Sequence, residues 1–518
     1  MPAAYLPIIY VRGFAGGTRG IDDAVDDPFY GFNAGSTHIR VGSGGTPRFY
    51  QFESPLLRLM MDHGYRLEVK GSQSQVLATA QENELDPRTI WIYRFYDASA
   101  DTFGVEPVPY DIERAAQGLR DYIQLVLAKT RDADQVYLVA HSMGGLVCRS
   151  AIQRYMHDLG PTTPEPRQAS DVPPPFPVSK VVTYATPHGG IDIELGGPIG
   201  DWFIDVFGPG GSDIFTERRM REYLMPEGME DWVPKDGTWD PRLPYASPLP
   251  AERYLSLVGT NPDDYGVAAG WSSRAVGVKS DGLVQIRNAY VKGSNRAYVH
   301  RSHSGRYGIV NSEEAYQNLR RFLFGNLKVT MGLTGLDLRR SDGTVWQADV
   351  ALAIRGLSVL LHHQSTAHHC PVMLDDEAAK LDTADSPVPL ITTFLLPLDP
   401  GLPRRYAFSL RVLGIRETKD FFLFGSHLEQ IADWEDSLVV DVVTGDEGLV
   451  KLARWQWNST LAGPIAEAKE LSGELAWAPA NDHTDEAPSW VATIPVPATA
   501  AAILGQGTKI SMGVAAWR

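Results

Sequence analysis

Two hydrophobic patterns divide the chain near residue 325. Before that point, short apolar runs alternate with segments whose apolar residues recur every three to four positions. The expected strands cover residues 5–11, 90–96, 136–140, 178–185 and 254–258. The expected helices cover residues 55–63, 110–129, 143–157 and 312–324. Strands that alternate with helices predict a mainly parallel sheet covered on both faces.

After Gly325, apolar and polar residues alternate one by one over strand-length segments. The expected strands cover residues 327–331, 346–354, 406–412 and 437–443. Clusters of Gly, Pro and Asp separate them, which is typical of an antiparallel β-sandwich. We therefore expect an α/β domain over residues 1–326 and a β-sandwich domain over residues 327–518.

Two segments of the first domain do not fit the alternation. Residues 18–50 are rich in Gly, Asp and aromatics without periodicity, which predicts a long loop. Residues 190–252 hold apolar clusters around Trp202 and Phe203 and then a charged helical stretch. This segment is too long for an ordinary connection, so we expect a lid insertion. An equally good interpretation is that its aromatic residues pack the insertion onto the core.

Composition and charge narrow the class of protein. The 518 residues are 43% hydrophobic and 21% charged, which is ordinary for a globular chain. With 47 basic and 63 acidic residues the net charge is −16, which argues against binding to nucleic acid. The two cysteines, Cys148 and Cys370, exclude a disulfide framework.

Two sequence patterns, a signal peptide and a transmembrane segment, would indicate where in the cell the protein is found. The first residues lack the basic start and long apolar run of a signal peptide. No stretch approaches 18 uninterrupted apolar residues, so no transmembrane helix is expected. The resulting expectation is a cytoplasmic protein, with export by a route without a cleavable signal left open. The oligomeric state is not predicted.

The segment from Ala140 to Gly145 reads Ala-His-Ser-Met-Gly-Gly and lies between an expected strand and an expected helix. A serine on such a turn is held in a strained conformation that exposes its hydroxyl, and small neighbours let strand and helix pack closely. The helix N-terminus also favours developing negative charge. Ser142 is therefore the candidate nucleophile, against the alternative of a buried serine in a tight turn.

An oxyanion hole in this arrangement needs two backbone donors. One comes from the residue after the serine and one from a loop after an early strand. Met143 is the first candidate. Phe14, within Gly13-Phe14-Ala15-Gly16, is the second.

The serine needs a base, and the base needs an acid to orient it. In the α/β-hydrolases, which these motifs resemble, the order along the chain is serine, acid, histidine. Asp281 is the candidate acid, whereas Asp263 and Asp264 fit a turn better. For the base, we favour His303 in a polar loop over His300 after an apolar run.

Together these motifs resemble the α/β-hydrolase superfamily and, within it, the bacterial lipases and esterases. The matching residues are Gly13-Phe14, Ala140 to Gly145, Thr186-Pro187-His188-Gly189-Gly190, Asp281-Gly282 and Ser302-His303-Ser304-Gly305. The resemblance covers about residues 5–325. It departs from the family pattern in Ala140, where the first motif position is usually Gly, and in Arg12, where His is usual. It implies that the segment after Thr186 shapes the site, with His188, Trp202 and Phe203 as substrate-binding candidates.

The expected function is that of a serine carboxylic-ester hydrolase, an esterase or lipase that forms an acyl-enzyme. The substrate would be a small-molecule or lipid ester, with an apolar acyl chain or a polyester favoured. No cofactor is expected, because the acyl-enzyme mechanism requires none. No metal is expected either, because the dense cluster of His362, His363, His368, His369 and Cys370 matches no ligand spacing. Two alternatives stay open: an acyltransferase or thioesterase on the same scaffold, and a protein that binds lipid or a partner through its C-terminal domain.

Overall fold

The computed structural model describes residues 5–13, 37–41, 47–51, 55–68, 73–95, 111–159, 176–191, 211–235, 237–263, 279–304, 308–338, 344–374, 387–397, 403–419, 426–444, 450–461, 463, 471–475, 478–479 and 489–517. The chain divides into two compact units. The first comprises Ala4–Arg296 and His300–Leu319, and the second comprises Arg320–Arg518 with Ala297–Val299.

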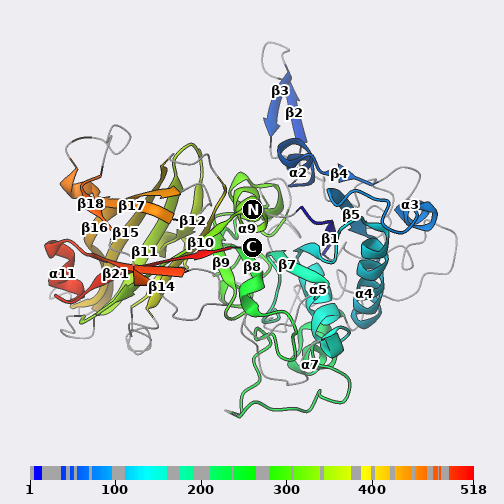
Figure 1. Ribbon diagram of the computed structural model, residues 1–518. Coiled ribbons are helices and arrows are strands. Elements are labelled where there is room, and N and C mark those ends of the chain that lie inside the picture. The colour runs from blue at the N-terminus through cyan, green and yellow to red at the C-terminus, as the bar shows by residue number, and fades with distance from the viewer. Residues whose placement is uncertain are drawn as a thin grey trace. The chain divides into compact units, whose positions relative to one another are not determined.

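One sheet has the strand order β4-β5-β1-β6-β7-β8-β9, and its strands β4 to β8 belong to the first unit (Figure 1). Each neighbouring pair from β4 to β8 is parallel, which confirms the predicted parallel sheet. Strands β1 and β8 are buried along their whole length, as apolar strands in the middle of a covered sheet are. The bounds are β1 (Ile8–Val11), β4 (Arg66–Leu67), β5 (Thr89–Tyr93), β6 (Val136–His141), β7 (Val178–Tyr184), β8 (Tyr254–Gly259) and β9 (Asn295–Val299).

Helices cover this sheet, and their ends follow the capping residues of the sequence. Asp111 accepts the backbone N–H of Arg114 at the start of α4, and Ser312 Oγ accepts that of Ala315 at the start of α9. Helices α4 and α5 pack side by side (Figure 1). The described α-helices are α2 (Pro55–His63), α3 (Gln73–Thr79), α4 (Ile112–Lys129), α5 (Gly144–Gln153), α7 (Glu217–Leu224) and α9 (Glu313–Phe324).

Two predictions for this unit are corrected. The segment 18–50, predicted to be a loop, contains an antiparallel pair, β2 (Thr37–Val41) and β3 (Pro47–Gln51). The Gly-rich run Gly42-Ser43-Gly44-Gly45 between two short runs with β-branched or aromatic residues was the missed hairpin signal. Helix α5 ends at Gln153, before the predicted end at 157.

The second unit holds two antiparallel sheets, with strand orders β14-β10-β21-β20-β19 and β12-β11-β15-β16-β17-β18, and β13 pairs with β11. The four predicted strands lie within β10, β11, β15 and β16. The first sheet has β10 (Leu327–Thr334), β14 (Val388–Leu395), β19 (Ala478–Pro479), β20 (Ser489–Pro495) and β21 (Lys509–Ala516), with α11 (Ala498–Leu504) before β21. The second has β11 (Val345–Ile354), β12 (Leu360–Gln364), β13 (Val372–Met373), β15 (Arg404–Lys419), β16 (Ser426–Thr444), β17 (Val450–Trp457) and β18 (Gly473–Glu474).

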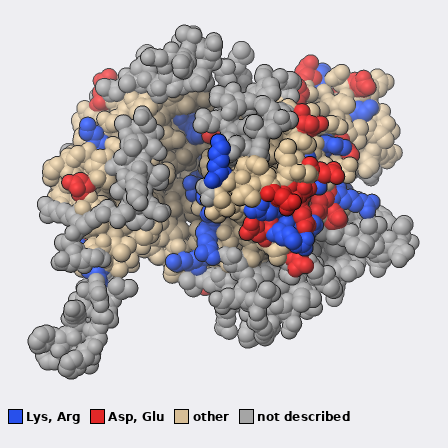
Figure 2. All heavy atoms as spheres, turned by 90° about the horizontal axis from the view of Figure 1, so that it is seen from below, with Lys and Arg blue, Asp and Glu red and all other residues tan. Residues whose placement is uncertain are grey.

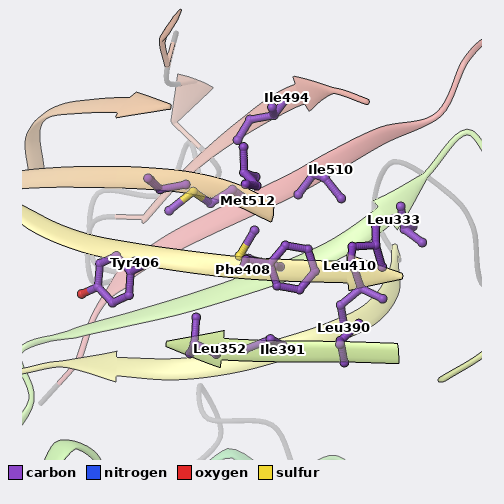
Figure 3. Packing of buried hydrophobic residues seen from close by; sticks show 14 of the residues in the cluster. Leu333, Leu352, Leu390, Ile391, Tyr406, Phe408, Leu410, Ile494, Ile510 and Met512 are labelled. Atoms are coloured by element: carbon purple, nitrogen blue, oxygen red, sulfur yellow. The ribbon is translucent and has the colours of Figure 1, made fainter. Parts of the chain in front are cut away.

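Side chains from both antiparallel sheets share one apolar core. Figure 3 shows Phe408 and Leu410 of β15 packed with Ile510 and Met512 of β21. Alternate residues of β15 point into this core, as the period of a strand requires. Each fully buried side chain of this kind contributes about 1.5–3 kcal/mol to folding.

Acidic and basic side chains lie intermixed on the face that Figure 2 shows, which is the underside of Figure 1. Helix α7 illustrates the mixing, because Arg221 pairs with Glu217 and Arg219 pairs with Glu113 of α4. The negative net charge therefore does not make this face uniformly acidic. Among the helices described, none is both long and apolar enough to cross a membrane.

Candidate active site

Ser142 lies on a strained turn between the end of β6 and the start of α5. Its φ is +53°, in the left-handed region that serine rarely adopts. Its backbone N–H donates to the Tyr184 carbonyl at 2.8 Å, and its carbonyl accepts the Thr186 hydroxyl at 2.8 Å. Two hydrogen bonds to the neighbouring strand and the segment after it therefore hold the strained residue in place.

Glycines make room for this turn. A Cβ added to Gly144 would lie 2.3 Å from the carbonyl oxygen of Val11, at the end of β1. A Cβ added to Gly13 would lie 2.6 Å from the Cβ of Ser142. Because both approaches are closer than real Cβ contacts, the turn and the loop after β1 can pack together only with glycine at these two positions.

Three side chains that the sequence proposed as a set form one hydrogen-bonded chain. His303 Nε2 lies 3.0 Å from Ser142 Oγ, and His303 Nδ1 lies 3.0 Å from Asp281 Oδ2. Ser142 is 8% exposed, His303 3% and Asp281 0%. A neutral histidine with its hydrogen on Nδ1 satisfies both neighbours, because it donates to the carboxylate and accepts from the hydroxyl.

Asp281 is fixed by its own turn and by the end of β8. Its Oδ1 accepts the backbone N–H groups of Leu283 at 3.0 Å and Val284 at 2.8 Å, which leaves Oδ2 for the histidine. A Cβ added to Gly259, the last residue of β8, would lie 2.8 Å from the Cβ of Asp281. The carboxylate thus lies at the carboxyl edge of the sheet, where the loops after parallel strands meet.

The alternative acid and base lie elsewhere. Asp263 is exposed, and its N–H donates to the Asn261 side chain at 3.0 Å, as in a turn; Asp264 lies outside the described residues. His300 is exposed, with Nδ1 3.3 Å from the Thr260 hydroxyl. Of these candidate acids and bases, the structure brings Asp281 and His303 to Ser142.

One predicted oxyanion donor can be placed. Met143 precedes α5, and in the described part of the chain its backbone N–H has no hydrogen-bond acceptor. Phe14 lies outside the described residues, which end at Gly13 on this loop. Gly13 itself packs against the turn that contains Ser142.

The predicted substrate-binding residues give a mixed result. His188 is fully buried, with Nε2 3.0 Å from the Thr183 hydroxyl, so its role in substrate binding stays a prediction. Burial, and after it the charge of Arg149, hold the pKa of His188 well below its usual value. Trp202 and Phe203 lie outside the described residues.

The described part of the insertion is tied to α5 by a buried polar pair that the sequence analysis missed. Arg149 donates to the carbonyl oxygens of Pro241 and Leu243 at 2.7 and 3.0 Å. Gln153 accepts from Arg149 at 2.8 Å and donates to the Tyr245 carbonyl at 2.9 Å. A long charged side chain and an amide four positions apart in a mainly apolar predicted helix were the available signal.

In the ranges that the structure describes, no three His, Cys, Asp or Glu side chains converge as a metal site would require. The rings of His363 and His368 contact each other edge to face, with centroids 4.5 Å apart.

Comparison with known proteins agrees with the resemblance seen in the sequence. Residues 72–208 match a family model described as "Putative serine esterase (DUF676)", which confirms the resemblance to serine esterases of the α/β-hydrolase type. The matched segment contains Ser142. No curated protein matches the chain.

Two solved structures are similar at a low level. One is the product of gene lin2722 of Listeria innocua, at 14% identity and a TM-score of 0.24, covering 62% of this chain and 94% of that one. The other is described as "the putative cell surface hydrolase from Lactobacillus plantarum WCFS1". It is 14% identical, with a TM-score of 0.26, and the alignment covers 62% of this chain and 92% of that one.

Proposed function

We propose that the chain is a serine carboxylic-ester hydrolase and that Ser142, His303 and Asp281 are its catalytic residues. The observation that carries the proposal is the buried hydrogen-bonded chain from Ser142 Oγ through His303 to Asp281. It ends on a strained serine in the segment that matches a serine-esterase family.

In this mechanism, Ser142 Oγ attacks the carbonyl carbon of the ester while His303 Nε2 takes its proton. Asp281 holds the Nδ1–H tautomer and stabilises the imidazolium. The tetrahedral oxyanion takes hydrogen bonds from the N–H of Met143 and, by the same proposal, of Phe14. His303 then protonates the leaving alcohol, and an acyl-enzyme remains. Water, activated by His303, attacks the acyl carbon and releases the carboxylic acid and free Ser142.

We also propose the division of labour along the chain. Residues 1–326 form the catalytic domain, residues 190–252 a lid over an apolar acyl group, and residues 327–518 an accessory β-sandwich. The parallel sheet of the first unit and the shared core of the two antiparallel sheets support the division into two domains, and the contacts of Arg149 attach the described end of the insertion to the first.

The test is hydrolysis of p-nitrophenyl esters of increasing acyl length by wild type, Ser142→Ala and Ser150→Ala. Ser150 is a buried serine of the same region, on α5, and serves as the matched control. We expect at least about 10³-fold loss in Ser142→Ala and near wild-type rates in Ser150→Ala. Preference for long chains would favour a lipase. Undiminished hydrolysis by Ser142→Ala would reject the proposal.

A further inference from the structure

His141, the residue before the candidate nucleophile, reaches across to the backbone of the candidate base. Its Nε2 lies 2.9 Å from the carbonyl oxygen of His303. A carbonyl oxygen only accepts hydrogen bonds, so Nε2 of His141 carries the hydrogen and donates it. The contact joins the end of β6 to the loop after β9.

This contact completes the anchoring of His303. The backbone N–H of His303 donates to the carbonyl of Asp281 at 2.9 Å, and its carbonyl accepts from the His141 ring at 2.9 Å. The side chain meanwhile lies between Asp281 and Ser142. These contacts form a closed ring. Ser142 contacts the imidazole of His303, the backbone carbonyl of His303 contacts His141, and a peptide bond joins His141 to Ser142.

The charge state of His141 suits this place. Its ring centroid lies 5.1 Å from that of His303, which must become positively charged when it takes the serine proton. Burial, and after it the neighbouring His303 and Arg12, lower the pKa of His141 to about 3. His141 is therefore neutral at neutral pH, and it holds the base without placing a second positive charge beside it.

We propose that His141 is a positioning residue: its Nε2–H holds the backbone carbonyl of His303, so that the base stays within reach of Ser142. This inference rests on the proposed function. Misplacing a catalytic group by about 1 Å can cost about 10²-fold in rate, so a contact of this kind has a measurable effect without touching the substrate.

The experiment compares His141→Phe, which keeps a ring without the donor, with His141→Gln, whose amide nitrogen can take the place of Nε2. His157→Phe is the matched control, because His157 also contacts a backbone carbonyl, that of Arg154 at 2.9 Å, on the 3-10 turn His157–Leu159. We expect kcat of His141→Phe to fall about 30- to 100-fold with KM for a p-nitrophenyl ester unchanged. His141→Gln should recover most of the loss, and His157→Phe should stay within about twofold of wild type.

Several results would overturn the inference. These are an unchanged kcat in His141→Phe, an equal loss in His141→Gln, or a loss that appears in KM alone. If His141→Phe does not fold, His141→Asn replaces it, because its shorter amide cannot reach the carbonyl and should lose activity where His141→Gln does not. Failure of the proposed function shows differently, as an absence of any Ser142-dependent rate in the wild type measured alongside.

Discussion

Polar groups are buried in both units, but they are held in different ways. In the second unit, Arg405 and Asp441 lie directly opposite each other on the adjacent strands β15 and β16 and form a two-pronged ion pair at 2.8 and 2.7 Å. In the first unit, the partners of His303 come from separate segments: Ser142 directly follows β6, and Asp281 lies in a turn between β8 and β9. Ser142, one of them, has a left-handed backbone.

The two arrangements differ in the backbone strain that they require. A cross-strand pair satisfies its charges with what the sheet already places side by side, and no backbone strain is needed. Three groups that converge from distant parts of the sequence onto a strained residue are costly to arrange, and such strain is concentrated at functional sites. The contrast fits the proposal that the carboxyl edge of the parallel sheet holds the catalytic residues, whereas the ion pair lies within the sheet of the second unit.

The largest effect is expected from substitutions that break the hydrogen bonds among Ser142, His303 and Asp281. Asp281→Asn should lower kcat about 10⁴-fold, because the amide disfavours the histidine tautomer that accepts from Ser142. His303→Ala should lose at least as much, whereas His300→Ala, at an exposed histidine, should remain close to wild type. Steady-state ester hydrolysis measures all three. If His300→Ala lost activity and His303→Ala kept it, the base would be wrongly assigned.

The second prediction breaks the cross-strand pair. Arg405→Ala leaves a buried carboxylate without its partner and should cost about 3–5 kcal/mol of unfolding free energy. Urea unfolding followed by tryptophan fluorescence measures the loss, while kcat on a short ester at low temperature should stay near wild type. A fall in kcat at a temperature where the variant is fully folded would tie the second unit to catalysis.

The third prediction tests the close packing at the turn. Gly144→Ala forces a Cβ against the backbone of β1 and should destabilise the chain by about 3 kcal/mol and reduce kcat. Gly507→Ala is the control in the other unit, since an added Cβ there meets one atom at an ordinary 3.7 Å. Thermal unfolding of both variants checks this, and equal melting temperatures would contradict the close approach.

The smallest expected effect is a pH dependence from His141. Its pKa is about 3 in the folded chain against 6.5 as the ordinary value, so the unfolded chain takes up the proton first as the pH falls. This destabilisation is negligible above about pH 7.5 and reaches about 2 kcal/mol at pH 5. His141→Gln should lack this part of the acid sensitivity. If the unfolding free energies of wild type and His141→Gln changed with pH in parallel, this pH dependence would not come from His141.

The sequence predicted those parts of the fold and site that local pattern determines. Ser142 could be found because Ala140 to Gly145 carry a motif at a strand end. The contacts of His141 and Thr186 could not be found, because they depend on which loops the sheet brings together. The pair β2–β3 was missed because its strands are short and their alternation is weak. The roles of Phe14, Trp202 and Phe203 stay predictions.

The central claim is that Ser142 is a nucleophile activated by His303. The most direct measurement is labelling with a fluorophosphonate, followed by intact mass and peptide mapping, for wild type, Ser142→Ala, Ser150→Ala and His303→Ala. We predict one adduct, on the peptide that contains Ser142, in wild type and Ser150→Ala, none in Ser142→Ala and a much slower reaction in His303→Ala. An unlabelled wild type, or an adduct that persists in Ser142→Ala, would contradict the account.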